Sequence, residues 1–182
     1  MKRKVKLSLI ALGLLSLVDI NDDMDVPETG STFEENAVIK AEAWFKKTGI
    51  ITIADDSGLE VDALGGAPGV RSARYAGETA DDAQNNKKLL NKLKDTPLEK
   101  RIARFRCVMA LAMFDGTKTF DGVVEGRLAL EPAGTSGFGY DPLFIPDGYD
   151  KTFAELGADV KNSLSHRARA LEKVVKFLSG GN

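Results

Sequence analysis

The chain has 182 residues, of which 43% are hydrophobic and 29% charged, and a formal net charge of −2 at pH 7. This length is typical of one domain that buries about 70% of the surface of its unfolded chain. The charge argues against nonspecific nucleic-acid binding, which needs a basic field. One cysteine, Cys107, rules out an intrachain disulfide, and with one histidine a zinc site is not expected. Any metal should therefore be held by carboxylates.

The N-terminal segment is basic and then apolar: four of residues 2–6 are Lys or Arg, and residues 7–18 are mostly hydrophobic. The pattern resembles a secretory signal, but no small-x-small cleavage site follows it, and the run is too short to span a bilayer. A short helix followed by a strand over residues 14–18 is the structural alternative. The sequence therefore predicts a cytoplasmic protein without a membrane partner, with secretion left as the alternative.

A helix is predicted after Ser31 or Thr32, ending near Lys47. Each of these hydroxyl residues has Glu three positions later, which is the pattern of a capping box, and Gly49 is the expected C-terminal stop. One stripe of the helix is apolar and should face the core: Phe33, Ala37, Ala41 and Trp44. Lys40 lies at the edge of this stripe, where it is either a surface lysine or a phosphate ligand.

Chemistry is expected in the segment that follows. Residues 50–54 form a short apolar run, which predicts a strand buried on both faces, and Asp55, Asp56, Ser57 and Gly58 follow it as a turn. Two adjacent carboxylates at a strand end repel each other and lose hydration, so a cation should lie beside them. Mg²⁺ is the natural candidate because it prefers carboxylate oxygen and water. A polar turn without a ligand is the alternative.

A β-hairpin is predicted near the middle of the chain. Residues 104–114 are largely apolar on both alternating faces, which predicts a central strand. Asp115-Gly116 is a hairpin signal, and residues 119–130 should form the returning strand. Gly122 and Gly126 within that strand indicate a bulge or a close approach of another backbone.

Three more helices are predicted. The first covers residues 80–94 after a cap at Thr79, and a short one begins with a capping box at Thr152. The last covers residues 166–178 after a cap at Ser165. Its predicted buried face consists of Ala168, Leu171, Val175 and Leu178.

The loop over residues 131–142 is rich in Gly and Pro, and two aromatic residues in it, Phe138 and Tyr140, precede the acid Asp141. A flat ligand could stack on Phe138 while backbone groups and Asp141 bind its edge. The alternative is a structured turn with two core aromatics. His166 and Arg167 should lie in the first turn of the last helix, where they either bind a polar or anionic partner or form a solvated cap.

Five motifs occur in one order from Val26 to the C-terminus: residues 28–37 (ETGSTFEENA), 54–59 (ADDSGL), 65–69 (GGAPG), 137–142 (GFGYDP) and 165–167 (SHR). This series resembles the inosine triphosphate pyrophosphatase family, which removes non-standard purine nucleoside triphosphates from the nucleotide pool. The resemblance implies an α/β fold with a mixed, elongated central sheet flanked by helices and a nucleotide cleft between two lobes. It also implies one domain over residues 1–182 and a homodimer.

The same resemblance implies Mg²⁺-dependent hydrolysis of ITP, dITP and XTP to the monophosphate and pyrophosphate. Glu28, Asp55 and Asp56 correspond to the metal-binding acids, and Asp56 also to the base that activates water. Lys40 and Ser57 correspond to phosphate-side contacts, and Lys4 is the residue kept from the phosphate loop. The nucleotide and base pocket corresponds to Phe138, Gly139, Tyr140, Asp141, Lys161, His166 and Arg167. The chemistry is coherent, because a metal on the phosphates neutralises developing charge while a carboxylate orients or deprotonates water.

The N-terminus departs from the family pattern. Members begin with an apolar strand and a Ser/Thr-x-Asn-x-x-Lys phosphate loop, of which this chain keeps only Lys4. The sequence thus predicts that this strand and loop are missing. Three interpretations stay open: an active pyrophosphatase, a nucleotide-binding homologue with little or no turnover, and a secreted protein of unrelated function.

Overall fold

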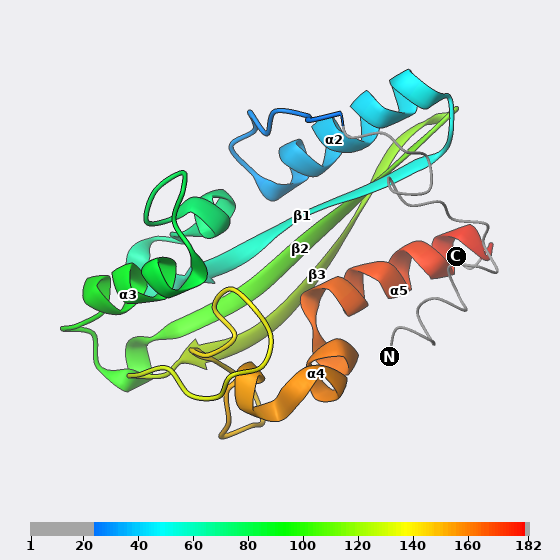
Figure 1. Ribbon diagram of the computed structural model, residues 1–182. Helices are drawn as coiled ribbons and strands as arrows, with labels where there is room; N and C mark the ends of the chain where they lie inside the picture. Colours follow the sequence, from blue (N-terminus) through cyan, green and yellow to red (C-terminus); the bar gives the residue numbers. More distant parts are fainter. Residues whose placement is uncertain (1–23, 181–182) are drawn as a thin grey trace.

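Within residues 24–180, which the computed structural model describes, a long antiparallel sheet of four strands forms the centre of the molecule (Figure 1). The strands are β1 (Thr52–Val61), β2 (Ile102–Met113), β3 (Gly116–Leu128) and β4 (Phe144–Pro146), hydrogen-bonded in that order. The predicted α/β fold is confirmed. The sheet was expected to be mixed, but each strand pair in this part of the chain is antiparallel. The predictions for the N-terminal segment, including Lys4 and the missing phosphate loop, lie outside the described residues.

Helices cover both faces of the sheet. They are α2 (Phe33–Thr48), α3 (Asp82–Lys92), α4 (Phe153–Leu164) and α5 (His166–Leu178), with the short 3-10 helices η1 (Asp62–Leu64), η2 (Gly69–Arg74) and η3 (Leu98–Lys100). Val108 and Ala110 of β2 pack against α2, whereas Cys107 and Met109 pack against α5. Because successive side chains of a strand point to opposite faces, α2 and α5 lie on opposite sides of the sheet (Figure 1). β2 is therefore the central strand that its apolar faces predict.

β1 differs from the prediction in a way that changes the site. The strand does not end before Asp55 but runs through residues 55–58 to Val61, paired with β2 along its whole length. The predicted buried start is also wrong, because Ile50 and Ile51 precede the strand and are about half exposed. A continuous partner strand outweighs the local turn preference of Asp, Ser and Gly, since it satisfies the backbone groups of each paired residue.

The predicted boundaries of α2 are confirmed to within one residue. Thr32 is the N-cap and forms a capping box with Glu35, and Gly49 ends the helix in the left-handed conformation, with φ of 69°. The predicted apolar stripe is buried. α3 begins two residues later than expected, because Asp81 rather than Thr79 caps it.

The β2–β3 hairpin is confirmed, and its register is unbroken from Ile102–Arg127 to Met113–Gly116. The two internal glycines are therefore sites of close approach rather than bulges. A Cβ on Gly122 would lie 2.1 Å from the carbonyl oxygen of His166, and one on Gly126 would lie 2.3 Å from that of Ile145. Gly122 thus allows the first turn of α5 to lie directly on β3.

This contact also determines which side of α5 is buried. The helix has the predicted bounds, but its buried residues are His166, Ala170 and Val174 rather than the predicted stripe. The stripe of Ala168, Leu171, Val175 and Leu178 is only partly buried, and Leu178 is exposed. The prediction was wrong because Gly122 has no side chain, so the backbone of His166 and Ala170 packs directly on β3. The side of α5 that carries these two residues is therefore the buried one.

α4 has the predicted capping box at Thr152 but is longer than expected, because it continues past a non-helical Gly157 to Leu164. Over residues 24–180, none of the helices combines the length and apolar character required to cross a membrane.

Candidate active site

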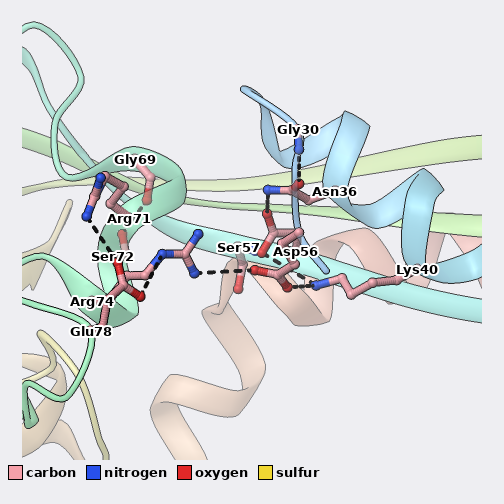
Figure 2. Close-up of polar contacts among 11 residues, drawn as sticks. Gly30, Asn36, Lys40, Asp56, Ser57, Gly69, Arg71, Ser72, Arg74 and Glu78 are labelled. Carbon is pink, nitrogen blue, oxygen red and sulfur yellow. Dashed lines mark hydrogen bonds and ion pairs between the residues drawn. The ribbon is translucent and has the colours of Figure 1, made fainter. Parts of the chain in front are cut away.

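A cluster of charged residues lies between β1 and α2 (Figure 2). Asp56 points toward α2, where Nδ2 of Asn36 donates to its Oδ2 at 3.1 Å and Nζ of Lys40 lies 3.7 Å from its Oδ1. The same ammonium donates to Oε1 of Glu28 at 2.5 Å. One cation therefore lies between Glu28 and Asp56, two of the three acids expected to bind a metal.

Asn36 holds this cluster together and was missed by the sequence analysis. It is fully buried, and its Oδ1 accepts a 2.7 Å hydrogen bond from the backbone N–H of Gly30, in the loop that carries Glu28. Its amide thus ties that loop to Asp56. A polar residue beside the apolar stripe of α2, four positions before Lys40, was the signal that could have identified it.

Arg74, at the end of η2, is a second functional candidate that the sequence did not single out. Its Nη1 lies 3.8 Å from Oε2 of Glu28, and its Nε lies 3.7 Å from Oε2 of Glu78 (Figure 2). Arg74, Lys40 and the two glutamates line a polar cavity of about 620 Å³. Cations on the wall of such a cavity suit an anionic ligand with several oxygens.

Asp56 has the environment of a proton acceptor. Its side chain is only 12% exposed, and burial raises the pKa of its carboxyl; Lys40 and the Asn36 hydrogen bond oppose that rise, and nearby Glu28 adds to it. A carboxylate whose pKa is raised toward neutrality is a better general base.

The donor set also fits Mg²⁺. In the described part of the chain no three or more His, Cys, Asp or Glu residues gather in a metal-binding group. Mg²⁺ commonly uses only one or two protein carboxylates and takes its other ligands from water and substrate phosphates. Glu28 and Asp56, both within 4 Å of the Lys40 ammonium, are such a pair.

Asp55 does not join this pair. It points to the opposite face of β1, where its Oδ2 accepts from Nε of Arg167 at 2.9 Å and lies 3.7 Å from Sγ of Cys107. Neighbouring residues of a strand alternate between faces, so Asp55 and Asp56 cannot both face α2. Of the three acids expected to bind a metal, Glu28 and Asp56 therefore lie together, whereas Asp55 lies on the other face of β1.

A second cavity, of about 170 Å³, is lined by Ser57 and Gly58 of β1 and by Arg167, the ion-pair partner of Asp55. Its lining brings together the seven residues expected in the nucleotide and base pocket: Phe138, Gly139, Tyr140, Asp141, Lys161, His166 and Arg167. Ser57, which was expected on the phosphate side with Lys40, lines this cavity as well. Lys40 belongs to the first cavity, and Lys4 is not among the described residues. Cavities of about 150 Å³ can admit a small aromatic ring, so this one can receive part of a flat heterocycle.

The loop that forms one wall of this second cavity is fixed by α3. The backbone N–H of Gly139 donates to Asp82 at 2.6 Å, and its carbonyl accepts from Nδ2 of Asn86 at 2.9 Å. The hydroxyl of Tyr140 donates to the carbonyl of Ser72 at 2.9 Å. Both backbone groups of Gly139 are therefore occupied, so this residue contributes by fixing the loop rather than by offering a free amide.

Phe138 offers a ring to a ligand, whereas Tyr140 is the core aromatic of the alternative interpretation. The Phe138 side chain is 62% exposed, with Nζ of Lys161 at 4.0 Å and Cζ of Arg167 at 6.0 Å from the ring centroid. Lys161 also pairs with the buried Asp141, whose Oδ2 accepts from the Phe138 N–H. An exposed ring beside two cations suits a flat ligand with polar atoms on its edge.

His166 is not the solvated cap that the alternative interpretation expects. It is 3% exposed and stacks on Phe105, with centroids 5.0 Å apart and planes 13° from parallel. Burial lowers the pKa of His166 to about 3, and the charges of Arg167 and Lys161 act in the same direction. The imidazole is therefore neutral at pH 7.

Two buried polar atoms beside this cavity have no hydrogen-bond partner in the described structure: Nδ1 of His166 and Oδ1 of Asp141. Both residues line the cavity. Because an unpaired buried polar group costs about 1–3 kcal/mol, a ligand with polar atoms on its edge would gain by pairing with them.

Comparisons with known proteins show which proteins this chain is similar to. The pattern of the Ham1 family matches residues 3–177. The dITP/XTP pyrophosphatase of Bacillus licheniformis is 56% identical over 164 residues, which cover 90% of this chain and 84% of that protein. The dITP/XTP pyrophosphatase of Bacillus subtilis is 55% identical over 164 residues, covering 90% and 83%.

Solved structures show the same fold. The Staphylococcus aureus Ham1 protein superposes with a TM-score of 0.90 at 44% identity, covering 99% of this chain and 95% of that one. A HAM1 protein from Coxiella burnetii gives a TM-score of 0.86 at 41% identity, with 100% and 95% covered.

Proposed function

The chain belongs to the Ham1 family, and from this premise we propose that it hydrolyses dITP, XTP and ITP to the monophosphate and pyrophosphate. One observation carries the proposal: the described structure holds one cavity lined by carboxylates and cations and a second cavity lined by an exposed ring and by residues with unpaired polar atoms. The first, here called the phosphate cavity, suits a triphosphate, and the second, here called the base cavity, suits a purine base. The relatives that are 55–56% identical are dITP/XTP pyrophosphatases by name.

On the phosphate side, Glu28 and Asp56 would hold Mg²⁺, which when bound supplies positive charge beside the phosphate oxygens. Lys40 and Arg74 now pair with Glu28. We infer that these two cations turn to the phosphate oxygens when the nucleotide enters, since charged hydrogen bonds to phosphate replace those to the carboxylate. The cavity thus exchanges one set of ion pairs for another.

Asp56 is the proposed general base. Its carboxylate takes a proton from the water that attacks the α-phosphorus, and the bond to the β-phosphate breaks to release pyrophosphate. Asn36 fixes the direction of this carboxylate by a hydrogen bond of 3.1 Å to its Oδ2. Positioning of this kind is a large part of phosphoryl-transfer catalysis.

On the base side, Phe138 would stack on the purine, while Asp141, Lys161, His166 and Arg167 bind its edge. A neutral His166 offers one ring N–H and one acceptor nitrogen, and Arg167 offers only donors. A 6-keto oxygen pairs with donors, whereas the 6-amino group of adenine would be opposed by them. This supports a preference for ITP over ATP.

Three broader expectations accompany this proposal. The two cavities together form a cleft between two lobes of one domain, residues 1–182. A homodimer is expected, which sedimentation analysis tests. A cytoplasmic location stays a prediction that cell fractionation tests.

The test is release of pyrophosphate from ITP and from ATP in the presence of Mg²⁺. A site that hydrogen-bonds one substrate group can reject the wrong analogue by about 10⁴-fold, so we expect a preference for ITP of that order. Asp56→Asn should lower kcat by about 10²-fold or more while binding of ITP is retained better. Equal efficiencies on the two nucleotides, or near-wild-type turnover by the variant, would refute the proposal.

A further inference from the structure

We propose that Asp55 is a positioning residue for base recognition, which holds the Arg167 guanidinium against the base cavity and takes no part in metal binding. The inference rests on the proposed function, because it assumes that Arg167 contacts the purine. The two adjacent acids of β1 then act at opposite ends of the substrate, Asp56 at the phosphates and Asp55 at the base.

The geometry is that of an oriented ion pair. Nε of Arg167 donates to Oδ2 of Asp55 at 2.9 Å, and the same oxygen lies 3.7 Å from the Cys107 thiol on β2. Burial raises the pKa of Cys107 to about 12, so the sulfur keeps its proton and can donate it. Asp55 is thus fixed to the sheet on one side and holds the guanidinium on the other.

Arg167 needs such an anchor because it is the least restrained cation of the base cavity. Lys161 pairs with the buried Asp141, but the Arg167 side chain is 43% exposed and its Cζ is 6.0 Å from the Phe138 centroid. An arginine side chain loses rotamer entropy when a ligand orders it, and a partner that already holds its guanidinium reduces that loss. Asp55 is the acid that the structure pairs with it.

A simpler role is an ion pair that fastens α5 to the sheet. The chain contains a matched example: Asp121 of β3 accepts from Nζ of Lys173 of α5 at 2.7 Å, and neither residue lines the base cavity. If pairing with α5 were the whole role of Asp55, then Asp55→Asn and Asp121→Asn should behave alike. The second variant is therefore the control for the first.

The experiment measures binding of two probes by calorimetry, IMP for the base cavity and pyrophosphate with Mg²⁺ for the phosphate cavity. For Asp55→Asn we expect IMP to bind about fivefold more weakly, the scale of a partly exposed ion pair, while pyrophosphate binding is unchanged. Asp121→Asn should leave both affinities at the wild-type value. The Mg²⁺ concentration for half-maximal turnover should also stay the same in Asp55→Asn.

A double variant tests whether Asp55 acts through Arg167. Because the two residues form one unit, Asp55→Asn combined with Arg167→Ala should bind IMP no more weakly than Arg167→Ala alone. Additive losses, an unchanged IMP affinity in Asp55→Asn, or a several-fold rise in its Mg²⁺ requirement would each overturn the inference. Absence of IMP binding by the wild-type protein would instead refute the proposed function.

Discussion

His166 is the only histidine of the chain, so lowering the pH from about 7 to 5 charges a single imidazole in the unfolded protein. In the folded protein that ring lies against Phe105 between the sheet and α5, 3% exposed, and its pKa is lowered to about 3. At any pH between this value and the pKa of about 6.5 of an exposed histidine, the folded state therefore binds fewer protons than the unfolded state. The contribution of the neutral His166 ring to stability is fully present above the pKa of the unfolded state and is lost as the pH falls below that pKa.

The size of the effect follows from the pKa of about 6.5 for an exposed histidine. Each pH unit below that value costs about 1.4 kcal/mol while the folded ring stays neutral. At about pH 5 the loss is therefore about 2 kcal/mol, a sizeable part of the 5–15 kcal/mol that stabilises a typical domain. Continued acidification toward pH 3 should increase it further.

The assay is urea denaturation at a series of pH values for the wild-type protein and His166→Gln. Glutamine is polar but does not titrate, so subtracting the two stability curves removes the common contribution of the carboxylates. The free energy of unfolding of the wild-type protein, relative to that of His166→Gln, should fall by about 2 kcal/mol from pH 7 to pH 5. As the only imidazole, the His166 ring also gives an unambiguous NMR signal, whose shift should stay at the neutral value down to pH 5. A titration midpoint near 6.5, or parallel stability curves, would refute this account of the buried ring.

Two further outcomes are expected. Arg74→Gln should weaken binding of pyrophosphate with Mg²⁺ by about tenfold, which is the scale of one charged hydrogen bond, and should leave IMP binding unchanged. Calorimetry measures both affinities. Equal losses for the two ligands would contradict the assignment of Arg74 to the phosphate cavity. Gly122→Ala should lower the melting temperature by about 4–10 °C, because its methyl group would meet the His166 carbonyl, which lies 2.1 Å from the Cβ position. An unchanged melting temperature in a scanning calorimeter would show that α5 does not depend on this approach.

Local sequence determined much of the secondary structure and most of the members of the site. The stop at Gly49 and the β2–β3 hairpin follow from interactions within a few residues and were predicted correctly. The capping box of Thr32 and Glu35 is one of the two overlapping boxes that the sequence predicted. The ordered motifs likewise led to most of the residues that line the second cavity and, in the first cavity, to Glu28. These features are readable because their causes lie next to one another in the chain.

Tertiary structure decided what each of these residues does. Residues 55–58 prefer a turn by themselves, but pairing with β2, about 50 positions later, extends them and sends Asp55 and Asp56 to opposite faces. Gly122 determines the inward side of α5, and Asn36 reaches Asp56 only because α2 packs on that face. Periodicity identifies an apolar stripe but carries no information about which distant backbone approaches it. The separation of Asp55 from Asp56, on which the proposed phosphate and base sides depend, therefore comes from strand pairing and helix docking, which act between segments far apart in the sequence.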